Sequence, residues 1–165
     1  MKKGDIVFVR GKGWLSKVIR YFDSGEFSHC AIAVSKYRII EANYNTRVSV
    51  SIFDESKYDL IEVIDLGLSD KQRDIVYERA MKYLGKKYDY FQLIWYALKK
   101  VFHFKGRNLL NNPNDMICSE LVFIALDESG ILRDLGINDT VTNGSDLTPN
   151  ELYDLVKYVS YKKAS

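Results

Sequence analysis

β-Type segments fill the first part of this chain, and helical segments follow. Five segments are short, rich in apolar or β-branched side chains and separated by polar breaks: residues 6–10, 29–34, 38–43, 47–53 and 60–66. Connections this short favour an antiparallel sheet in which consecutive strands lie side by side. Residues 13–22 interrupt the strands with apolar side chains at helical spacing, which predicts one early helix.

The second part of the chain is predicted to be helical. Ser69 is a suitable N-cap for a helix over residues 70–84, because Gln72 stands at the capping-box position. Three further helices are expected over residues 88–104, 118–128 and 149–159. Strands first and helices later predict an α+β fold, an antiparallel β-sheet packed against helices, in a single domain over residues 1–165.

The composition is that of a globular protein with a substantial core, since 47% of the 165 residues are apolar and 28% are charged. No uninterrupted apolar run is longer than that of residues 93–98, whereas a membrane-spanning helix needs roughly 20 apolar residues. The formal net charge of +2 is too small to indicate a nucleic-acid partner. We therefore expect neither a transmembrane segment nor nucleic-acid binding.

The start of the chain and its few thiol and imidazole groups exclude further classes. Residues 1–13 do not form a signal-peptide pattern, because their apolar stretch is short and is broken by Arg10, so a cytoplasmic location is expected. Two cysteines and two histidines, far apart in sequence, favour neither a disulfide framework nor a zinc site. Gly11 and Gly13 lack the spacing of a phosphate-binding loop, and no cofactor is predicted.

Cys118 is the first candidate for chemistry. It stands between a polar loop and an apolar helix. A cysteine at a helix N-terminus meets unpaired N–H groups and the positive end of the helix dipole, and both favour the nucleophilic thiolate. The alternative is that Cys118 is a small buried apolar residue, since free cysteines are among the most buried residue types.

His29 is the second candidate, at the start of a predicted strand. Alternation places His29, Ala31 and Ala33 on one face and Cys30 on the other. Because the His29 face carries small residues, we expect the helix that begins at Cys118 to pack against that face. Cys30 is interpreted as structural, within the apolar layer. The alternative for His29 is an ordinary core or edge histidine.

A thiol–imidazole pair usually needs a third polar group that orients the ring and stabilises its charged form. Glu41 lies among apolar residues in a strand, where an unpaired carboxylate is costly, so it needs a partner such as His29 on the neighbouring strand. Asn43 has the same face parity as Glu41 and is the reserve candidate. The alternative is that Glu41 faces solvent or pairs with Arg38 or Arg47.

Four short segments, taken in their order and spacing, carry a family resemblance. They are residues 4–8 (GDIVF), 27–32 (FSHCAI), 117–122 (ICSELV) and 146–152 (DLTPNEL). The pattern resembles the circularly permuted branch of the NlpC-type papain-like cysteine hydrolases, the YiiX-like group, and residues 84–90 (LGKKYDY) also fit it. In this branch the histidine strand precedes the cysteine helix, as His29 precedes Cys118 here.

The resemblance implies a permuted papain-like fold in which Cys118 is the nucleophile, His29 the base and Glu41 the third residue of a catalytic triad. It implies a peptide, a cell-wall fragment or an acyl group as substrate, and a cysteine hydrolase that cleaves an amide bond through an acyl-enzyme. A second hypothesis is a lipid-directed thiol acyltransferase or thioesterase similar to the lecithin:retinol acyltransferase-like proteins, with residues 88–104 lining an apolar pocket. A third is a non-catalytic binding or structural module on the same fold.

Overall fold

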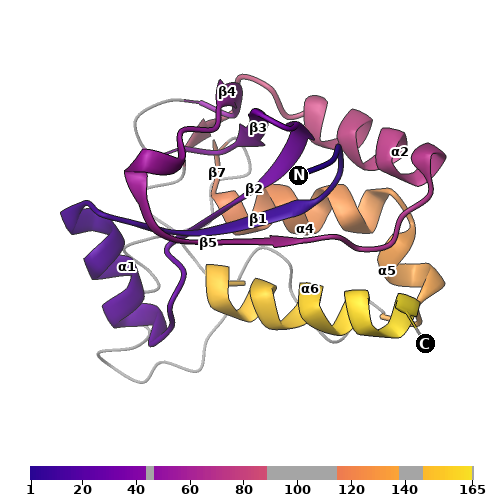
Figure 1. Ribbon diagram of the computed structural model, residues 1–165. Coiled ribbons are helices and arrows are strands. Elements are labelled where there is room, and N and C mark those ends of the chain that lie inside the picture. The colour runs from indigo at the N-terminus through magenta and orange to yellow at the C-terminus, as the bar shows by residue number, and fades with distance from the viewer. Residues whose placement is uncertain (44–46, 89–114, 138–146, 165) are drawn as a thin grey trace.

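The computed structural model describes residues 1–43, 47–88, 115–137 and 147–164 (Figure 1). A five-stranded sheet with the order β4-β3-β2-β1-β5 stands at its centre, and every strand pair is antiparallel. The strands are β1 (Ile6–Gly11), β2 (His29–Ser35), β3 (Arg38–Glu41), β4 (Ser49–Ile52) and β5 (Tyr58–Ile64). The expected antiparallel sheet is confirmed. Only β5 departs from sequential pairing, because it crosses back to pair with β1 at the far edge.

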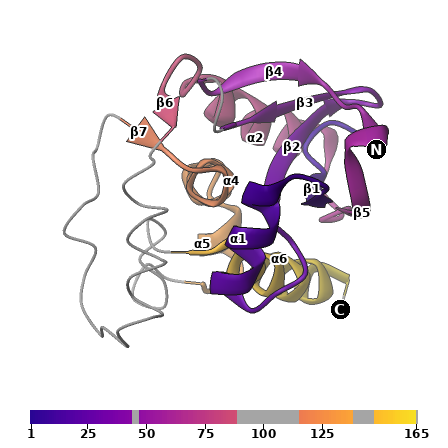
Figure 2. The ribbon, with the colours of Figure 1, turned by 90° about the vertical axis from the view of Figure 1, so that its left-hand side faces the viewer.

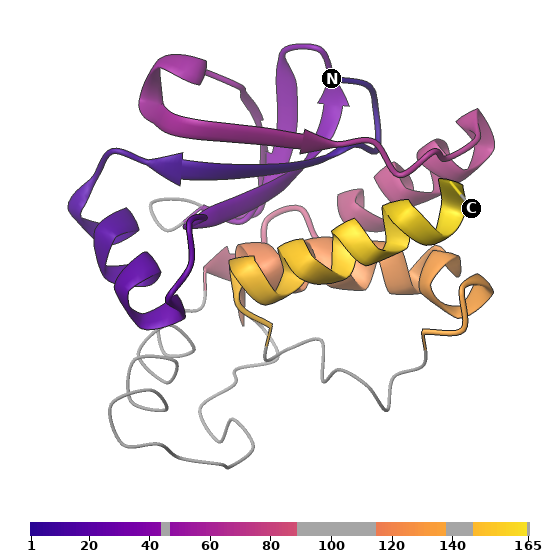
Figure 3. The same cartoon turned by 60° about the horizontal axis from the view of Figure 1, so that its bottom comes forward.

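The long helices gather on one face of this sheet (Figures 1 and 3). They are α2 (Asp70–Met81), α4 (Cys118–Glu128) and α6 (Pro149–Ala164). α1 (Trp14–Asp23) stands at one end of the sheet (Figure 1), and the remaining described helices are the single turns η1 (Glu55–Lys57) and α5 (Ile131–Asp134). The short strands β6 (Lys87–Tyr88) and β7 (Asp115–Met116) pair in parallel beside one end of α4 (Figure 2). The α+β class is therefore confirmed.

Two helices begin with reciprocal caps. The Ser69 hydroxyl accepts a hydrogen bond from the Gln72 N–H, and the Gln72 side chain accepts one from the Ser69 N–H, as expected for α2. Thr148 and Glu151 form the same box at the start of α6. α6 runs to residue 164 rather than ending near 159. Most of the helix expected over 88–104 lies outside the described residues.

The sheet separates two apolar clusters, and their composition corrects one expectation. Cys30, Ile32 and Phe8 belong to the larger cluster, together with the apolar side of α4. Ala31 and Ala33 point to the opposite face, in a smaller cluster with other strand residues and Phe53. α4 therefore packs on the Cys30 face and not on the His29 face. The larger side chains of the Cys30 face offer a helix more apolar surface to bury than two alanines do.

No helix among the described segments is long and apolar enough to cross a bilayer.

Candidate active site

Cys118 is the first residue of α4. β7 ends at Met116, and Ile117 leads into the helix as an extended N-cap that offers no side-chain hydrogen bond. The N–H groups of the first turn therefore have no side-chain cap from this position, and the positive end of the helix dipole lies at the cysteine. The Ser119 hydroxyl donates to the backbone carbonyl of Leu147 at 2.6 Å, which ties this turn to the segment before α6.

His29 and Glu41 face each other from neighbouring strands. His29 opens β2 and Glu41 closes β3, and the ring Nε2 lies 2.6 Å from the carboxylate Oε2. The hydroxyl of Ser51, on β4, donates to the other carboxylate oxygen at 2.6 Å. Asn43, the reserve candidate, also forms a side-chain hydrogen bond with Glu41. The buried carboxylate thus has partners on both oxygens, and Asn43 supports Glu41 instead of replacing it.

The sulfur of Cys118 completes this group, and we call Cys118, His29, Glu41 and Ser51 the His29 cluster. Cys118 and His29 interact: the charge and hydrogen bond of Cys118 raise the pKa of His29, and the charge of His29 lowers the pKa of Cys118. Since Nε2 of the ring is bonded to Glu41, Nδ1 is the nitrogen left for the sulfur. The structure therefore brings together the three residues that the sequence selected, although helix α4 and the His29 side chain approach the sheet on different faces.

Cys30 is the residue whose contact the sequence missed. Its thiol and its backbone N–H stabilise the charged sulfur of Cys118 and so lower the pKa of that thiol. The interpretation of Cys30 as a member of the apolar layer holds, since it is fully buried in the larger cluster. That Cys118 is its neighbour was not predictable, because strand alternation does not show which end of a helix lies over the strand.

The electrostatics of the cluster favour charge separation. Burial alone would lower the pKa of His29, but the charge and hydrogen bond of Cys118 and the bond to Glu41 raise it from 6.5 to about 10. Hydrogen bonds from Cys30 and the charge of His29 outweigh burial and hold the pKa of Cys118 well below its usual range. Burial would raise the pKa of Glu41, but its partners lower it to about 2. Thiolate, imidazolium and carboxylate are thus the favoured forms at neutral pH.

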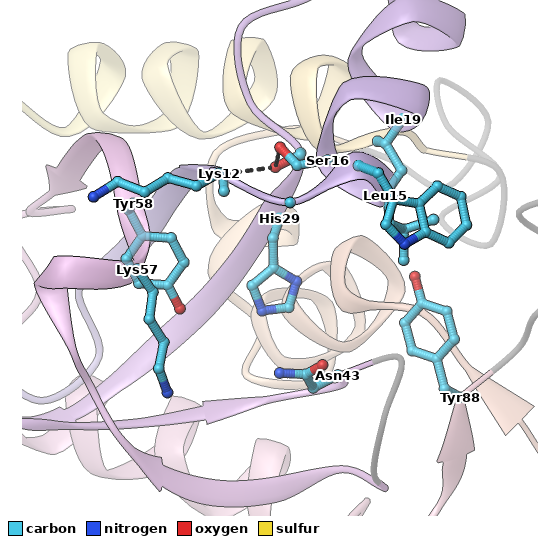
Figure 4. A pocket seen from close by; sticks show the side chains of 13 residues that line it. Lys12, Leu15, Ser16, Ile19, His29, Asn43, Lys57, Tyr58 and Tyr88 are labelled. Carbon is cyan, nitrogen blue, oxygen red and sulfur yellow. Dashed lines mark hydrogen bonds between the residues drawn. The ribbon is translucent and has the colours of Figure 1, made fainter.

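A pocket of about 380 Å³ opens beside His29 (Figure 4). Residues from the loop before α1 and from α1 form one side of its wall, and residues at or next to the ends of β2, β3, β5 and β6 form the rest; they include Lys12, Trp14, Ser16, Asn43, Lys57, Tyr58 and Tyr88. In the view of Figure 4, His29 lies between Tyr58 and Tyr88. The imidazole is therefore accessible from a space large enough for a substrate side chain.

Ser28 fixes the loop that forms one wall of this pocket. Its hydroxyl oxygen accepts hydrogen bonds from the Ser16 hydroxyl at 2.7 Å and from the Gly11 N–H at 3.1 Å. Neither these serines nor the wall residue Tyr58 stood out in the sequence. A hydroxyl that anchors a loop has no local sequence pattern, because its role depends on contacts between segments that only the fold brings together.

The order of these parts defines a class. A histidine on an early strand precedes a cysteine at the start of a later helix, and both elements belong to one antiparallel sheet and its helical layer, which is the order that the family resemblance implies. Among solved structures, the crystal structure of the metalloprotein YiiX from Escherichia coli O157:H7 matches with a TM-score of 0.58 and 23% identity. The match covers 78% of this chain and 66% of the YiiX chain, just under two thirds. The chain therefore has the YiiX fold, as its motifs predicted.

Neither the family models nor the curated proteins gave a match. YiiX is described as a metalloprotein. Within the parts of the chain that the structure describes, no group of three or more His, Cys, Asp or Glu side chains is arranged to hold a metal ion. The residues present therefore do not fit a metal centre there, and the chemistry below uses side chains alone.

Proposed function

We propose that this protein is a cysteine hydrolase that cleaves an amide bond in a peptide or cell-wall peptide, with Cys118 as nucleophile. One observation carries the proposal: the ring Nε2 of His29 is held 2.6 Å from Glu41, and the same ring interacts with the Cys118 thiol so that the pKa of His29 is raised and that of Cys118 lowered. A nucleophile beside a base that a third group orients is the arrangement that covalent catalysis requires. A cysteine with a purely structural role needs neither partner.

In the first half of the reaction the Cys118 thiolate attacks the carbonyl carbon of the substrate. A carbon–sulfur bond forms, and the carbonyl electron pair moves to the oxygen, whose charge the N–H groups at the start of α4 stabilise. The His29 imidazolium then gives its proton to the leaving amine as the carbon–nitrogen bond breaks. A thioester on Cys118 and a neutral imidazole remain.

In the second half a water molecule takes the place of the amine. Neutral His29 accepts a proton from this water as the water oxygen attacks the thioester carbon. The carbon–sulfur bond breaks, the carboxylic acid leaves, and the thiolate and imidazolium are restored. Glu41 remains ionised throughout, since its pKa is lowered to about 2, and it keeps the ring oriented.

The pocket beside His29 has a mixed wall. Asn43, Lys57 and Tyr58 contribute polar side chains, and Trp14, Leu15 and Ile19 contribute apolar ones. The Ser16 hydroxyl is bonded to Ser28, and the Lys12 ammonium to the Ser56 carbonyl, so both groups already have partners within the protein. A wall of this kind fits a peptide, which carries both polar and apolar groups, and the family resemblance makes peptide and cell-wall amides our first choice of substrate.

Trapping the acyl-enzyme tests the proposal. The protein is incubated separately with a panel of peptides and cell-wall peptides and with a panel of lipid esters, and its intact mass is measured after acid quenching. We expect an acyl adduct on Cys118 from the amide panel, and none on the Cys118→Ala variant. An adduct from lipid esters alone would overturn the amide substrate in favour of the lipid-directed acyltransferase.

The third hypothesis, a non-catalytic module, has its own outcome. No adduct from either panel, combined with a Cys118→Ala protein that keeps full biological activity, would contradict catalysis. That result would leave the His29 cluster as a structural feature of a binding module.

A further inference from the structure

Cys30 takes no step in the proposed reaction, yet it contacts the nucleophile. Its side chain is fully buried on the helix-facing side of β2, and Cys118 is 4% exposed in the same apolar cluster. α4 packs on this side of β2, and the Cys30 thiol is a neighbour that lowers the pKa of Cys118. These two are the only cysteines of the chain, and both are free thiols. Both thiols of the chain are therefore neighbours in the fold.

We infer that Cys30 and Cys118 form a reversible disulfide when a hydroperoxide reaches the site. Cys118 is the residue that is oxidised first, and Cys30 is the resolving cysteine. The disulfide blocks the nucleophile and protects it from irreversible oxidation. The blocking effect rests on the proposed function, whereas the formation of the disulfide rests only on the contact between the two thiols.

The chemistry takes two steps. The Cys118 thiolate attacks one oxygen of the peroxide, the O–O bond breaks, and Cys118 becomes a sulfenic acid while hydroxide (or an alkoxide from an organic hydroperoxide) leaves. The Cys30 sulfur then attacks the Cys118 sulfur, the S–O bond breaks, and the Cys30 proton leaves with the oxygen as water. Two electrons have passed from the sulfurs to the peroxide. A dithiol restores both thiols by exchange.

The surroundings of the pair suit this sequence of events. Low-pKa cysteines beside a resolving cysteine are the ones that sense peroxide. A peroxide is small enough to enter the pocket that His29 lines, and Cys118 is the neighbour whose charge raises the His29 pKa. Both thiols are buried, but burial raises the pKa of Cys30, which stays uncharged, so Cys118 is the site of first attack.

To form a disulfide, the two sulfurs must come closer together than they are in this structure. Cys30 lies inside β2, which is paired with β1 on one side and β3 on the other. Cys118 lies in the first turn of α4, which has no side-chain cap at Ile117. The end of a helix moves more easily than the centre of a sheet, so the first turn of α4 is the part that shifts.

Counting thiols tests the inference without any substrate. The full-length wild-type protein, Cys30→Ser and Cys30→Ala are freed of reductant, exposed to hydrogen peroxide, and alkylated in denaturant before mass analysis. We expect the wild type to lose both thiols together, to yield a peptide pair that links residues 30 and 118, and to recover both thiols with dithiothreitol. In both variants Cys118 should pass to the sulfinic acid, which dithiothreitol does not reverse.

The inference is overturned if the wild type yields no linked peptide pair and dithiothreitol rescues its Cys118 no better than in the Cys30 variants. The linked peptide is measured on the wild type, so it does not depend on how the variants fold. A disulfide without any acyl adduct on Cys118 would contradict the proposed function alone. An acyl adduct without the disulfide would contradict the inference alone.

Discussion

Two groups of charged side chains lie in this protein, each built around a buried carboxylate, and their surroundings differ. In the first, Arg73 of α2 donates to Asp5 at 2.7 Å and to Asp65 at 2.5 Å, and also to the backbone carbonyls of Lys3 and Leu68. We call Arg73, Asp5 and Asp65 the Arg73 cluster. The Arg73 guanidinium donates to acceptors in the segment before β1 and in the segment after β5. These hydrogen bonds link both segments to α2.

The His29 cluster contains the same kinds of charge but a different distribution of partners. Glu41 is as fully bonded as Asp5, whereas His29 shares its second nitrogen with a nucleophilic sulfur and lines a pocket. A cluster in which every donor is hydrogen-bonded to an acceptor of the protein stabilises the fold. A cluster that keeps a reactive atom next to a pocket can do chemistry. The predictions below test this division.

The largest expected effect is on Cys118. Replacing Cys118 with Ala removes the nucleophile, and the rate of amide hydrolysis should fall by about 10⁵-fold or more. The thermal unfolding transition should move little, because the change leaves the apolar contacts of Cβ in place. Initial rates and a melting curve measure both. A variant that keeps a tenth of the wild-type rate would show that Cys118 is not the nucleophile.

Arg73 should show the reverse pattern. Arg73→Met leaves Asp5 buried without its cation, and the free energy of unfolding should fall by about 3–5 kcal/mol, as for other broken buried ion pairs. Activity per folded molecule should stay unchanged. Denaturant titration and active-site titration measure the two quantities. Lys3→Met, which removes the exposed pair with Asp74, is the control and should leave unfolding as it is. If Arg73→Met instead slowed turnover in the folded protein, the division between the clusters would be wrong.

Glu41 should affect chemistry more than folding. Glu41→Gln keeps the side-chain shape but removes the charge that stabilises imidazolium, so hydrolysis should slow by about 10²-fold. The His29 pKa, about 10 in the wild type, should fall, and the alkaline limit of activity should move to lower pH. A pH–rate profile measures both changes. An unmoved alkaline limit would mean that Glu41 does not act on His29.

Ser51 should have the smallest effect of the four. Ser51→Ala removes one neutral hydrogen bond to Glu41, which is worth about 1 kcal/mol, so the rate should fall only a few-fold. Ser49→Ala, on the same strand β4, is the matched control. A loss as large as that of Glu41→Gln would mean that Ser51 itself takes part in the reaction.

The sequence predicted the local part of the site well. β2 and β3 form a hairpin with a short turn, so strand alternation was enough to place His29 near Glu41. The helix caps at Ser69 and Thr148 were readable for the same reason, since each depends on residues within one turn.

The long-range part was beyond local patterns. Which face α4 covers is decided by the apolar surface of the whole sheet, so the prediction from Ala31 and Ala33 was wrong, and the contact of Cys30 with Cys118 went unseen. β6 and β7 are too short to show any alternation. β5 pairs with β1, which would otherwise be an edge strand, and the short connection from β4 to β5 does not indicate this pairing.

The most direct test of the central claim is the pH dependence of Cys118 alkylation by iodoacetamide in the wild type and in His29→Gln. In the folded protein Cys118 is held as a thiolate by Cys30 and His29, so the wild-type rate should reach its plateau well below the usual thiol pKa of about 8.5. In His29→Gln the midpoint should rise towards that value. Identical midpoints in the two proteins, or a wild-type Cys118 that reacts no faster than the buried Cys30, would contradict the account.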